Sequence, residues 1–226
     1  MTDPIRIDVW SDIACPWCYI GKRNLEQGLA ATASDDDPPA IEITFHSYEL
    51  APDTPVDVAG DAIGHLAQRQ GLPREQVQEM FDRVTQVAAA AGLEYHFEHL
   101  QSTNTVKAHE LLHAAKAAGR QLEMAERLMS AHFVEGKHVG RVDDLVELAA
   151  EVGLDRDEIR GALESGRYLQ DVRADQAQAT AYGITGVPFF VIDGKYGISG
   201  AQPADAFTQI ARQVWAERDA LVSTTD

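Results

Sequence analysis

The chain contains two cysteines, and only two residues separate them, in the segment Cys15-Pro16-Trp17-Cys18. A disulfide across two residues closes too short a loop to staple a fold of 226 residues, so the pair is predicted to do chemistry. Positions 5–10 alternate with a period of two, which is typical of a half-buried strand. Pro16 suits the first turn of a helix, because its missing N–H would have no intrahelical partner there. The cysteines are therefore predicted to lie where a strand ends and a helix begins.

A second strand is predicted at 41–46, one helix after the first, which makes a βαβ opening. Between about 56 and 180, strand signals vanish and alanine-rich helical patterns replace them. Strand character returns at 188–192, a hairpin turn is offered by Asp193-Gly194, and a last helix is predicted from Pro203. Helices of the central block are predicted at 73–91, 103–118, 122–135, 143–152, 155–163 and 168–182.

A thiol at the start of a helix is in a place that favours its ionised form. The free N–H groups and the dipole of the helix stabilise an anion there, so Cys15 is predicted to be the nucleophile. Cys18 lies one turn deeper and is predicted to be the resolving thiol. The other interpretations are two zinc ligands or two inert thiols, but structural zinc needs four Cys or His ligands, and none follow at the usual spacing. A CxxC pair inside a βαβ unit favours dithiol–disulfide chemistry.

The overall charge excludes several classes of partner. Lys and Arg number 19 against 36 Asp and Glu, a formal net charge of -17, which repels nucleic acid and anionic membrane surfaces. No apolar run approaches the roughly 20 residues that a membrane span needs. The first residues are acidic where a signal peptide would be basic, so we expect a cytoplasmic protein. The sequence makes no prediction of oligomeric state.

Several longer stretches resemble the DsbA family of thioredoxin-fold proteins, in particular its cytoplasmic FrnE-like branch. They are 8–21 (DVWSDIACPWCYIG), 104–111 (NTVKAHEL), 132–136 (HFVEG), 151–155 (EVGLD) and 185–203 (TGVPFFVIDGKYGISGAQP). The resemblance implies an α/β fold, a thioredoxin-like domain split by a large all-helical insertion. Residues 1–55 and 181–226 would form the thioredoxin-like domain, and 56–180 the insertion. It also implies that the Val187–Pro188 bond is cis and packs against the active-site disulfide.

One motif competes with the cysteines for the function. His109, Glu110 and His113 match HExxH, the signature of zinc proteases, on a segment predicted to be helical. The extended form of that motif needs Gly where Lys116 stands. The candidate third ligands have no distinctive spacing; they are Glu123, Glu126, His132 and His138. The segment also falls within the family resemblance, where it is not a metal site, so no metal is predicted.

The sequence thus predicts a thiol–disulfide oxidoreductase that exchanges disulfides with protein or small-molecule substrates, glutathione among the candidates, and needs no bound cofactor. Pro188 would shape the substrate edge, the main chain of Val187 would pair with an extended substrate, and Trp17 would border the substrate surface. One alternative is a glutathione-dependent transferase or isomerase of the kappa-class or 2-hydroxychromene-2-carboxylate isomerase type. Those relatives typically carry Ser where Cys15 stands and an acidic residue near the position of Gln202. A second alternative is a redox-inactive chaperone or binding module.

Overall fold

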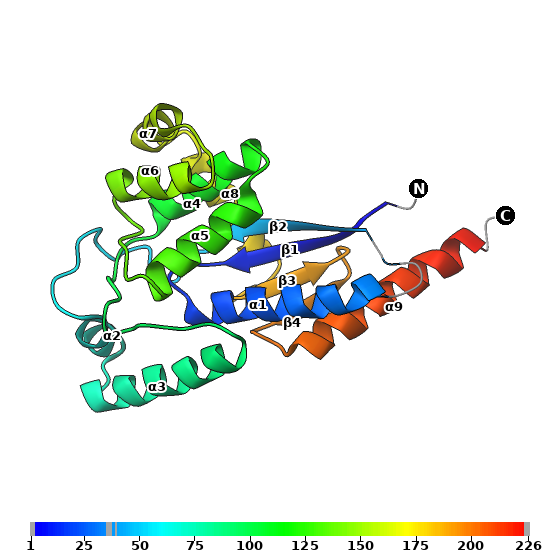
Figure 1. The fold of residues 1–226 in the computed structure, drawn as a ribbon, viewed down its shortest axis with the longest axis horizontal. Helices are drawn as coiled ribbons and strands as arrows, with labels where there is room; N and C mark the ends of the chain where they lie inside the picture. Colours follow the sequence, from blue (N-terminus) through cyan, green and yellow to red (C-terminus); the bar gives the residue numbers. More distant parts are fainter. Residues whose placement is uncertain (1–2, 35–37, 39, 224–226) are drawn as a thin grey trace.

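The structure is a computed structural model that describes residues 3–34, 38 and 40–223. Its centre is a four-stranded sheet in the order β2-β1-β3-β4 (Figure 1). β1 and β2 run parallel, whereas β3 is antiparallel to both of its neighbours. The strands are β1 (Ile5–Ser11), β2 (Ile41–Ser47), β3 (Phe189–Ile192) and β4 (Tyr196–Ser199). The predicted order of strands and helices, and with it the α/β fold class, is confirmed.

The alternation in β1 separates the two faces of the sheet. Ile5, Ile7 and Val9 are almost fully buried in the main core, whereas Trp10 points into a smaller cluster on the opposite face. At the other end of the sheet, Asp193 and Gly194 take φ values of 54° and 68° in the turn between β3 and β4. Positive φ at both central residues is what a tight hairpin turn needs, which is why the Asp-Gly pair predicts it.

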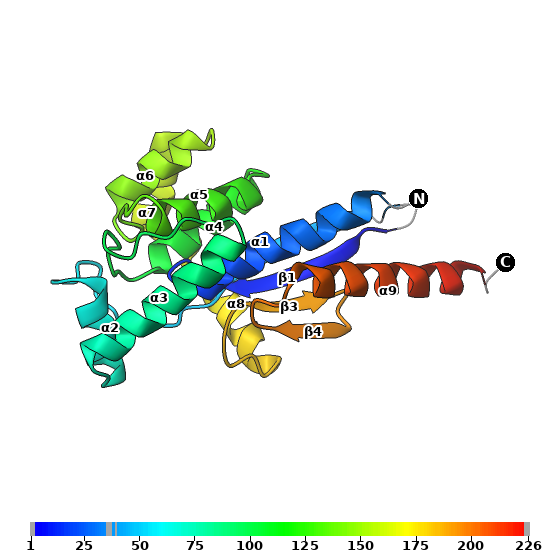
Figure 2. The same ribbon diagram turned by 60° about the horizontal axis from the view of Figure 1, so that its bottom comes forward.

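One face of the sheet is covered by α1 (Pro16–Ala30) and α9 (Ala204–Ser223), which lie against each other (Figure 2). A short 3-10 helix, η1 (Ala31–Ser34), follows α1. The two long helices approach closely at Gly28, where an added Cβ would lie 2.3 Å from the carbonyl oxygen of Ala204. The hydroxyl of Thr208 donates a hydrogen bond of 2.8 Å to the Gly28 carbonyl at the same crossing. The opposite face is covered by α8 (Leu169–Ala181), whose Ala179 packs in the cluster around Trp10.

The remaining helices gather at the end of the sheet where β1 ends and α1 begins (Figure 1). They are α2 (Ala62–Gln70), α3 (Arg74–Ala90), α4 (Val106–Ala117), α5 (Gln121–Phe133), α6 (Val142–Glu151) and α7 (Arg156–Ser165). The described residues between 56 and 180 form no strand, as predicted. Helix α2 was not predicted, because it is short and buries only Ala62 and Ala67. The proposed domain boundaries at 55/56 and 180/181 stay predictions.

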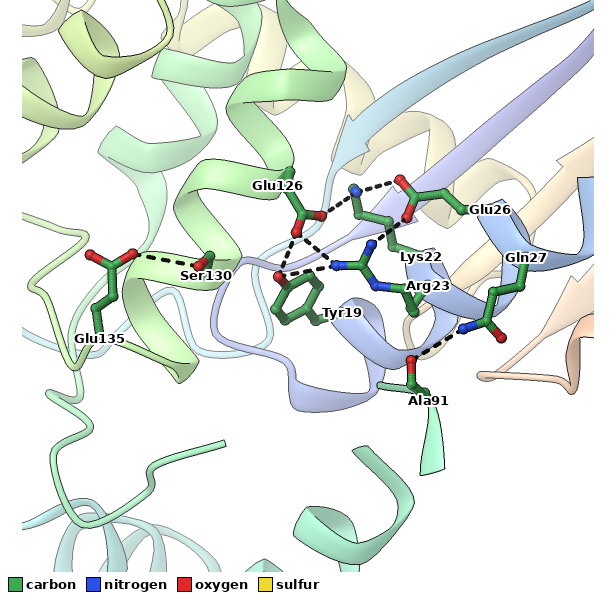
Figure 3. Close-up of polar contacts among 9 residues, drawn as sticks. All are labelled: Tyr19, Lys22, Arg23, Glu26, Gln27, Ala91, Glu126, Ser130 and Glu135. Carbon is green, nitrogen blue, oxygen red and sulfur yellow. Dashed lines mark hydrogen bonds and ion pairs between the residues drawn. The ribbon is translucent and has the colours of Figure 1, made fainter. Parts of the chain in front are cut away.

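An ion-pair network fixes α5 against α1 (Figure 3). The Glu126 carboxylate accepts hydrogen bonds from the Tyr19 hydroxyl at 2.6 Å, the Lys22 ammonium at 2.5 Å and the Arg23 guanidinium at 2.8 Å. The Lys22 side chain is only 4 % exposed and also pairs with Glu26, so its charge is shared between two carboxylates. The helix that carries the cysteines is therefore tied directly to the helical segment.

Candidate active site

Cys15 and Cys18 lie at the start of α1, immediately after β1. Cys15 is the N-cap, with extended backbone angles, and Pro16 is the first helical residue. The Cys15 N–H donates to the carbonyl of Asp12 at 3.1 Å, and the Cys18 N–H donates to the carbonyl of Cys15 at 3.0 Å. Both cysteines are free thiols. Local sequence thus places the first sulfur at the helix start and the second one turn inside.

The two thiols have different surroundings. Cys18 is 2 % exposed, and burial raises the pKa of its thiol well above the ordinary value. The neighbouring Cys15 raises the pKa of Cys18 further, while hydrogen bonds with the Ser11 side chain and the Asp12 backbone act in the opposite direction. Cys15 is 4 % exposed, but it borders a cavity that Cys18 does not line. Cys18 is therefore held as a neutral thiol behind Cys15.

The segment before β3 returns to the cysteines from the far end of the chain. The Val187–Pro188 peptide bond is cis, and the Cys15 Sγ lies 3.6 Å from the Val187 carbonyl oxygen, within hydrogen-bonding distance for sulfur. Gly21 permits this approach, because an added Cβ there would lie 2.9 Å from the Pro188 ring. The structure thus places Val187 and Pro188, which directly precede β3, beside the cysteine pair.

On the other side of Cys15 lies a cavity of about 530 Å³, which sequence reasoning did not predict. Its walls come from the start of α1, from α2 and α3, from the end of α5, and from the loops that precede α2 and α4. Four aromatic side chains line it: Trp17, Phe81, Phe97 and Phe133. Trp17, predicted to border the substrate surface, is 42 % exposed in this wall. Val187 and Pro188 are not among the lining residues, so Cys15 has two distinct neighbouring surfaces.

Asp12 is a further site residue that the sequence analysis did not single out. Its buried carboxylate accepts the N–H of Leu50 at 2.8 Å and that of Ala14 at 3.2 Å. Burial alone would raise the pKa of Asp12, but the nearby His109 imidazole, together with these N–H groups, holds it below the ordinary value. Asp12 therefore acts as an ionised anchor for the loop that leads into Cys15. The sequence feature that could have predicted this role is the position of the carboxylate, three residues before the first cysteine.

The HExxH residues contact different groups. His109 Nε2 lies 3.4 Å from Asp12 Oδ1, and Glu110 is paired with the Lys107 ammonium at 2.6 Å. His113 Nε2 lies 3.0 Å from Asp175 Oδ2. Across the described parts of the chain, no group of three or more His, Cys, Asp or Glu side chains is arranged to hold a metal ion. The side chains of this motif are therefore engaged in separate buried polar contacts.

The other residues considered as a third zinc ligand also contact groups that are separate from one another. Glu126 belongs to the network on α1, and Glu123 pairs with Arg120. His138 accepts the N–H of Gly140 at Nδ1. Burial lowers the pKa of His132 to about 4, so this imidazole is neutral near pH 7. Among the residues placed by the structure, no helix is long and apolar enough to cross a membrane.

Comparisons with known proteins agree with this geometry. Residues 6–211 match the DSBA-like thioredoxin domain. The uncharacterized protein YwbO of Bacillus subtilis (strain 168) is 32% identical over 209 residues, covering 90% of this chain and 94% of YwbO. The crystal structure of the probable DsbA oxidoreductase SCO1869 from Streptomyces coelicolor superposes with a TM-score of 0.86 at 40% identity, covering 94% of this chain and 91% of that one.

More distant structures share the fold. The cytosolic disulfide reductase DsbM from Pseudomonas aeruginosa, solved with GSH, has a TM-score of 0.65 at 17% identity, over 92% of this chain and 98% of DsbM. A 2-hydroxychromene-2-carboxylate isomerase has a TM-score of 0.68 at 13% identity, over 96% of this chain and 98% of the isomerase. At these identities the likeness shows the fold alone.

Proposed function

Because the chain belongs to the family of DSBA-like thioredoxin domains, we propose that it is a thiol–disulfide oxidoreductase with Cys15 as nucleophile and Cys18 as resolving thiol. The observation that carries this proposal is the asymmetry of the pair. Cys15 caps a helix and borders a cavity, whereas Cys18 is buried behind it with a raised pKa. The sulfur of Cys15 can react with a substrate disulfide, whereas the sulfur of Cys18 can react only with that of Cys15.

The reaction follows from this arrangement. The Cys15 thiolate attacks one sulfur of a substrate disulfide, so that a Cys15–substrate bond forms and the other substrate sulfur leaves as a thiolate. Cys18 then loses its proton and attacks Cys15 Sγ, which releases the second substrate thiol and closes the Cys15–Cys18 disulfide. The protein has lost two electrons and the substrate has gained them. The reverse sequence oxidises a substrate dithiol.

Val187 and Pro188 supply the edge for an extended substrate in this proposal. The Val187 carbonyl lies beside Cys15 Sγ, and among the described residues the Val187 N–H has no hydrogen-bond partner. A free main-chain donor beside a reactive sulfur is suited to pairing with a substrate backbone. Protein disulfides would use this edge, and small thiols, glutathione included, are also substrates in the proposal. No bound cofactor takes part.

The FrnE-like branch and a cytoplasmic location are the finer parts of the proposal. They are supported by the stretches that resemble that branch, which span nearly the whole sequence. The alternative glutathione-dependent transferase or isomerase is less favoured, because Cys15 and Cys18 supply both thiols of a redox cycle.

The test is reduction of insulin disulfides by the wild type and by the Cys15→Ser and Cys18→Ser variants, with dithiothreitol as the electron source. We expect Cys15→Ser to abolish catalysis, since the chain has no thiol outside the pair, and Cys18→Ser to accumulate the mixed disulfide, because only dithiothreitol can then resolve it. Suppression of client aggregation is measured in parallel. A wild type that suppresses aggregation without reducing insulin, and does so equally with Cys15→Ser, would support the chaperone alternative instead.

A further inference from the structure

The cavity beside Cys15 combines an apolar wall with two exposed arginines, Arg69 and Arg83. Trp17, Leu50 and Met80 are exposed by 42 %, 43 % and 38 %, and all three line this one cavity. Phe81 and Phe97 stack behind them with ring centroids 4.2 Å apart. A volume of about 530 Å³ falls within the range of small-molecule sites, roughly 300–1,000 Å³. The wall therefore suits an apolar, flat group of modest size.

The charges around the cavity are unusual for this protein. Arg69 and Arg83 both line it, and within the described part of the chain neither forms an ion pair with a carboxylate. Most other arginines are paired, as Arg74 is with Asp61 and Arg156 with Glu147. The acid that lines the cavity, Asp12, is buried and already accepts two backbone N–H groups. In a chain of net charge -17, two arginines without acidic partners in the cavity that Cys15 borders favour an anionic ligand.

We propose that this cavity binds a small-molecule disulfide whose thiol half carries an apolar or aromatic body and a carboxylate. The proposal rests on the proposed function and names a substrate class for it. The body would pack against Trp17, Met80 and the stacked pair Phe81 and Phe97, and its carboxylate would meet Arg69 and Arg83. A polypeptide substrate is not assigned here, because the main-chain edge at Val187 lies outside this cavity.

The chemistry is the first half of the exchange described above. The Cys15 thiolate attacks the sulfur of the bound half, the sulfur–sulfur bond of the ligand breaks, and the other half leaves as a thiolate. Cys18 then displaces the bound half as a second thiol, and the Cys15–Cys18 disulfide forms. The ligand disulfide is the oxidant, so the electrons balance with no further reactant.

The test isolates the first step in a Cys18→Ser background. Two chromogenic disulfides are compared: dithiobis(nitrobenzoate), which carries a carboxylate on each ring, and dithiodipyridine, which is aromatic and uncharged near neutral pH. In the double variant Arg69→Gln, Arg83→Gln, we expect the rate with the dicarboxylate to fall about three- to tenfold, and the rate with the neutral reagent to stay within about twofold. The control is Arg6→Gln, which removes one positive charge from an exposed arginine on β1 that forms no ion pair among the described residues.

The apolar wall is tested separately. Met80→Ala should slow both reagents, whereas Val87→Ala, which removes an equally exposed side chain of α3 outside the cavity, should slow neither. An equal fall with both reagents in the arginine variant, or the same fall in Arg6→Gln, would overturn the carboxylate assignment. If insulin reduction by the Cys18-containing arginine variant fell as much as the dicarboxylate rate, the cavity would serve a polypeptide instead. Failure of Cys15 to react with either reagent would overturn the proposed function itself.

Discussion

At the residue scale, the site depends on how differently two thiols of one helix are surrounded. Cys15 caps α1, and it borders the cavity. Burial and the neighbouring Cys15 raise the pKa of Cys18, which favours its protonated form. Asp12 fixes the loop between β1 and Cys15 through the N–H groups of Leu50 and Ala14. The proposed roles of the two cysteines rest on these contacts rather than on their order in the motif.

This difference predicts the order of alkylation. In the fully reduced protein near neutral pH, iodoacetamide should modify Cys15 at least about tenfold faster than Cys18, because the thiolate is the reactive form and Cys15 lines a cavity. Peptide mass spectrometry after short pulses of reagent gives the two rates. The Cys15→Ser variant is the control that reports Cys18 alone. Modification of Cys18 first in the wild type would reverse the assigned roles.

At the scale of the elements, features that act within a few residues were predicted from the sequence pattern, whereas contacts between distant segments were not. The exception is the approach of Val187 and Pro188 to the cysteines, which the family resemblance implied. The alternation in β1, the Asp193-Gly194 turn and Pro16 at the start of α1 each act within a few residues, so the sequence reveals them. The cavity draws its walls from segments that only the fold brings together. The contacts of His113 with Ser47 and Asp175 likewise join residues from three elements. Such juxtapositions depend on packing, which no local period encodes.

Two glycine-to-alanine substitutions, one at the crossing of α1 and α9 and one in α7, are predicted to change the stability of the protein in opposite directions. Gly28→Ala should destabilise the protein by about 1–3 kcal/mol, because its Cβ would overlap the Ala204 carbonyl and lie 2.8 Å from the Phe207 Cβ. Gly161→Ala, in α7, has no atom within 4 Å of the added Cβ and should stabilise it by about 0.5–1 kcal/mol. Urea denaturation measures both. Equal effects of the two changes would argue against the close helix contact.

The tie between α5 and α1 predicts a second pair of variants. Glu126→Gln removes the negative charge and one of the two acceptor oxygens that Tyr19, Lys22 and Arg23 share, and leaves Glu26 as the charged partner of the buried Lys22. We expect a loss of about 1–3 kcal/mol in the free energy of unfolding. Glu123→Gln, on the same helix, loses an ion pair with the exposed Arg120 and no other among the described residues, so it should change this free energy by less than about 0.5 kcal/mol. A loss no larger than that of the control would show that the network does not hold the helices together.

At the scale of the whole molecule, one histidine of β2, His46, connects strands β1 and β2 to helix α8. His46 Nε2 lies 2.8 Å from Asp8 Oδ1, and His46 Nδ1 lies 2.8 Å from Asp175 Oδ1. The imidazole also stacks on Trp10 with ring centroids 4.5 Å apart. Asp175 has a second histidine neighbour, His113 from α4. Two carboxylates at the two ring nitrogens favour the doubly protonated, charged imidazole.

The titration of this group links the stability of the whole fold to pH. Burial alone would lower the pKa of His46, but the hydrogen bonds and charges of Asp175 and Asp8 raise it above the ordinary value. For Asp175, burial alone would raise the pKa, but hydrogen bonds with His113, His46 and the Ser47 N–H hold it well below its usual range. A raised histidine pKa adds stability that is complete below about pH 6.5 and disappears as pH rises through the folded-state value. A lowered aspartate pKa adds stability that is complete above about pH 4 and disappears as pH falls.

We therefore expect the wild type to be most stable in mildly acidic solution and to lose stability between about pH 6 and pH 9. As pH rises, the net negative charge of the chain grows, and this repulsion also lowers the stability of the fold. The wild type is therefore compared with His46→Gln, which keeps every other ionisable group but lacks the imidazole of His46. This variant should be about 1–3 kcal/mol less stable near pH 6, and the gap should narrow as pH rises. The control is His99→Gln, whose side chain is 69 % exposed and whose curve should follow the wild type. Urea denaturation at a series of pH values gives the curves, and a gap between wild type and His46→Gln that stays constant from pH 6 to pH 9 would contradict a charged His46 in the folded protein.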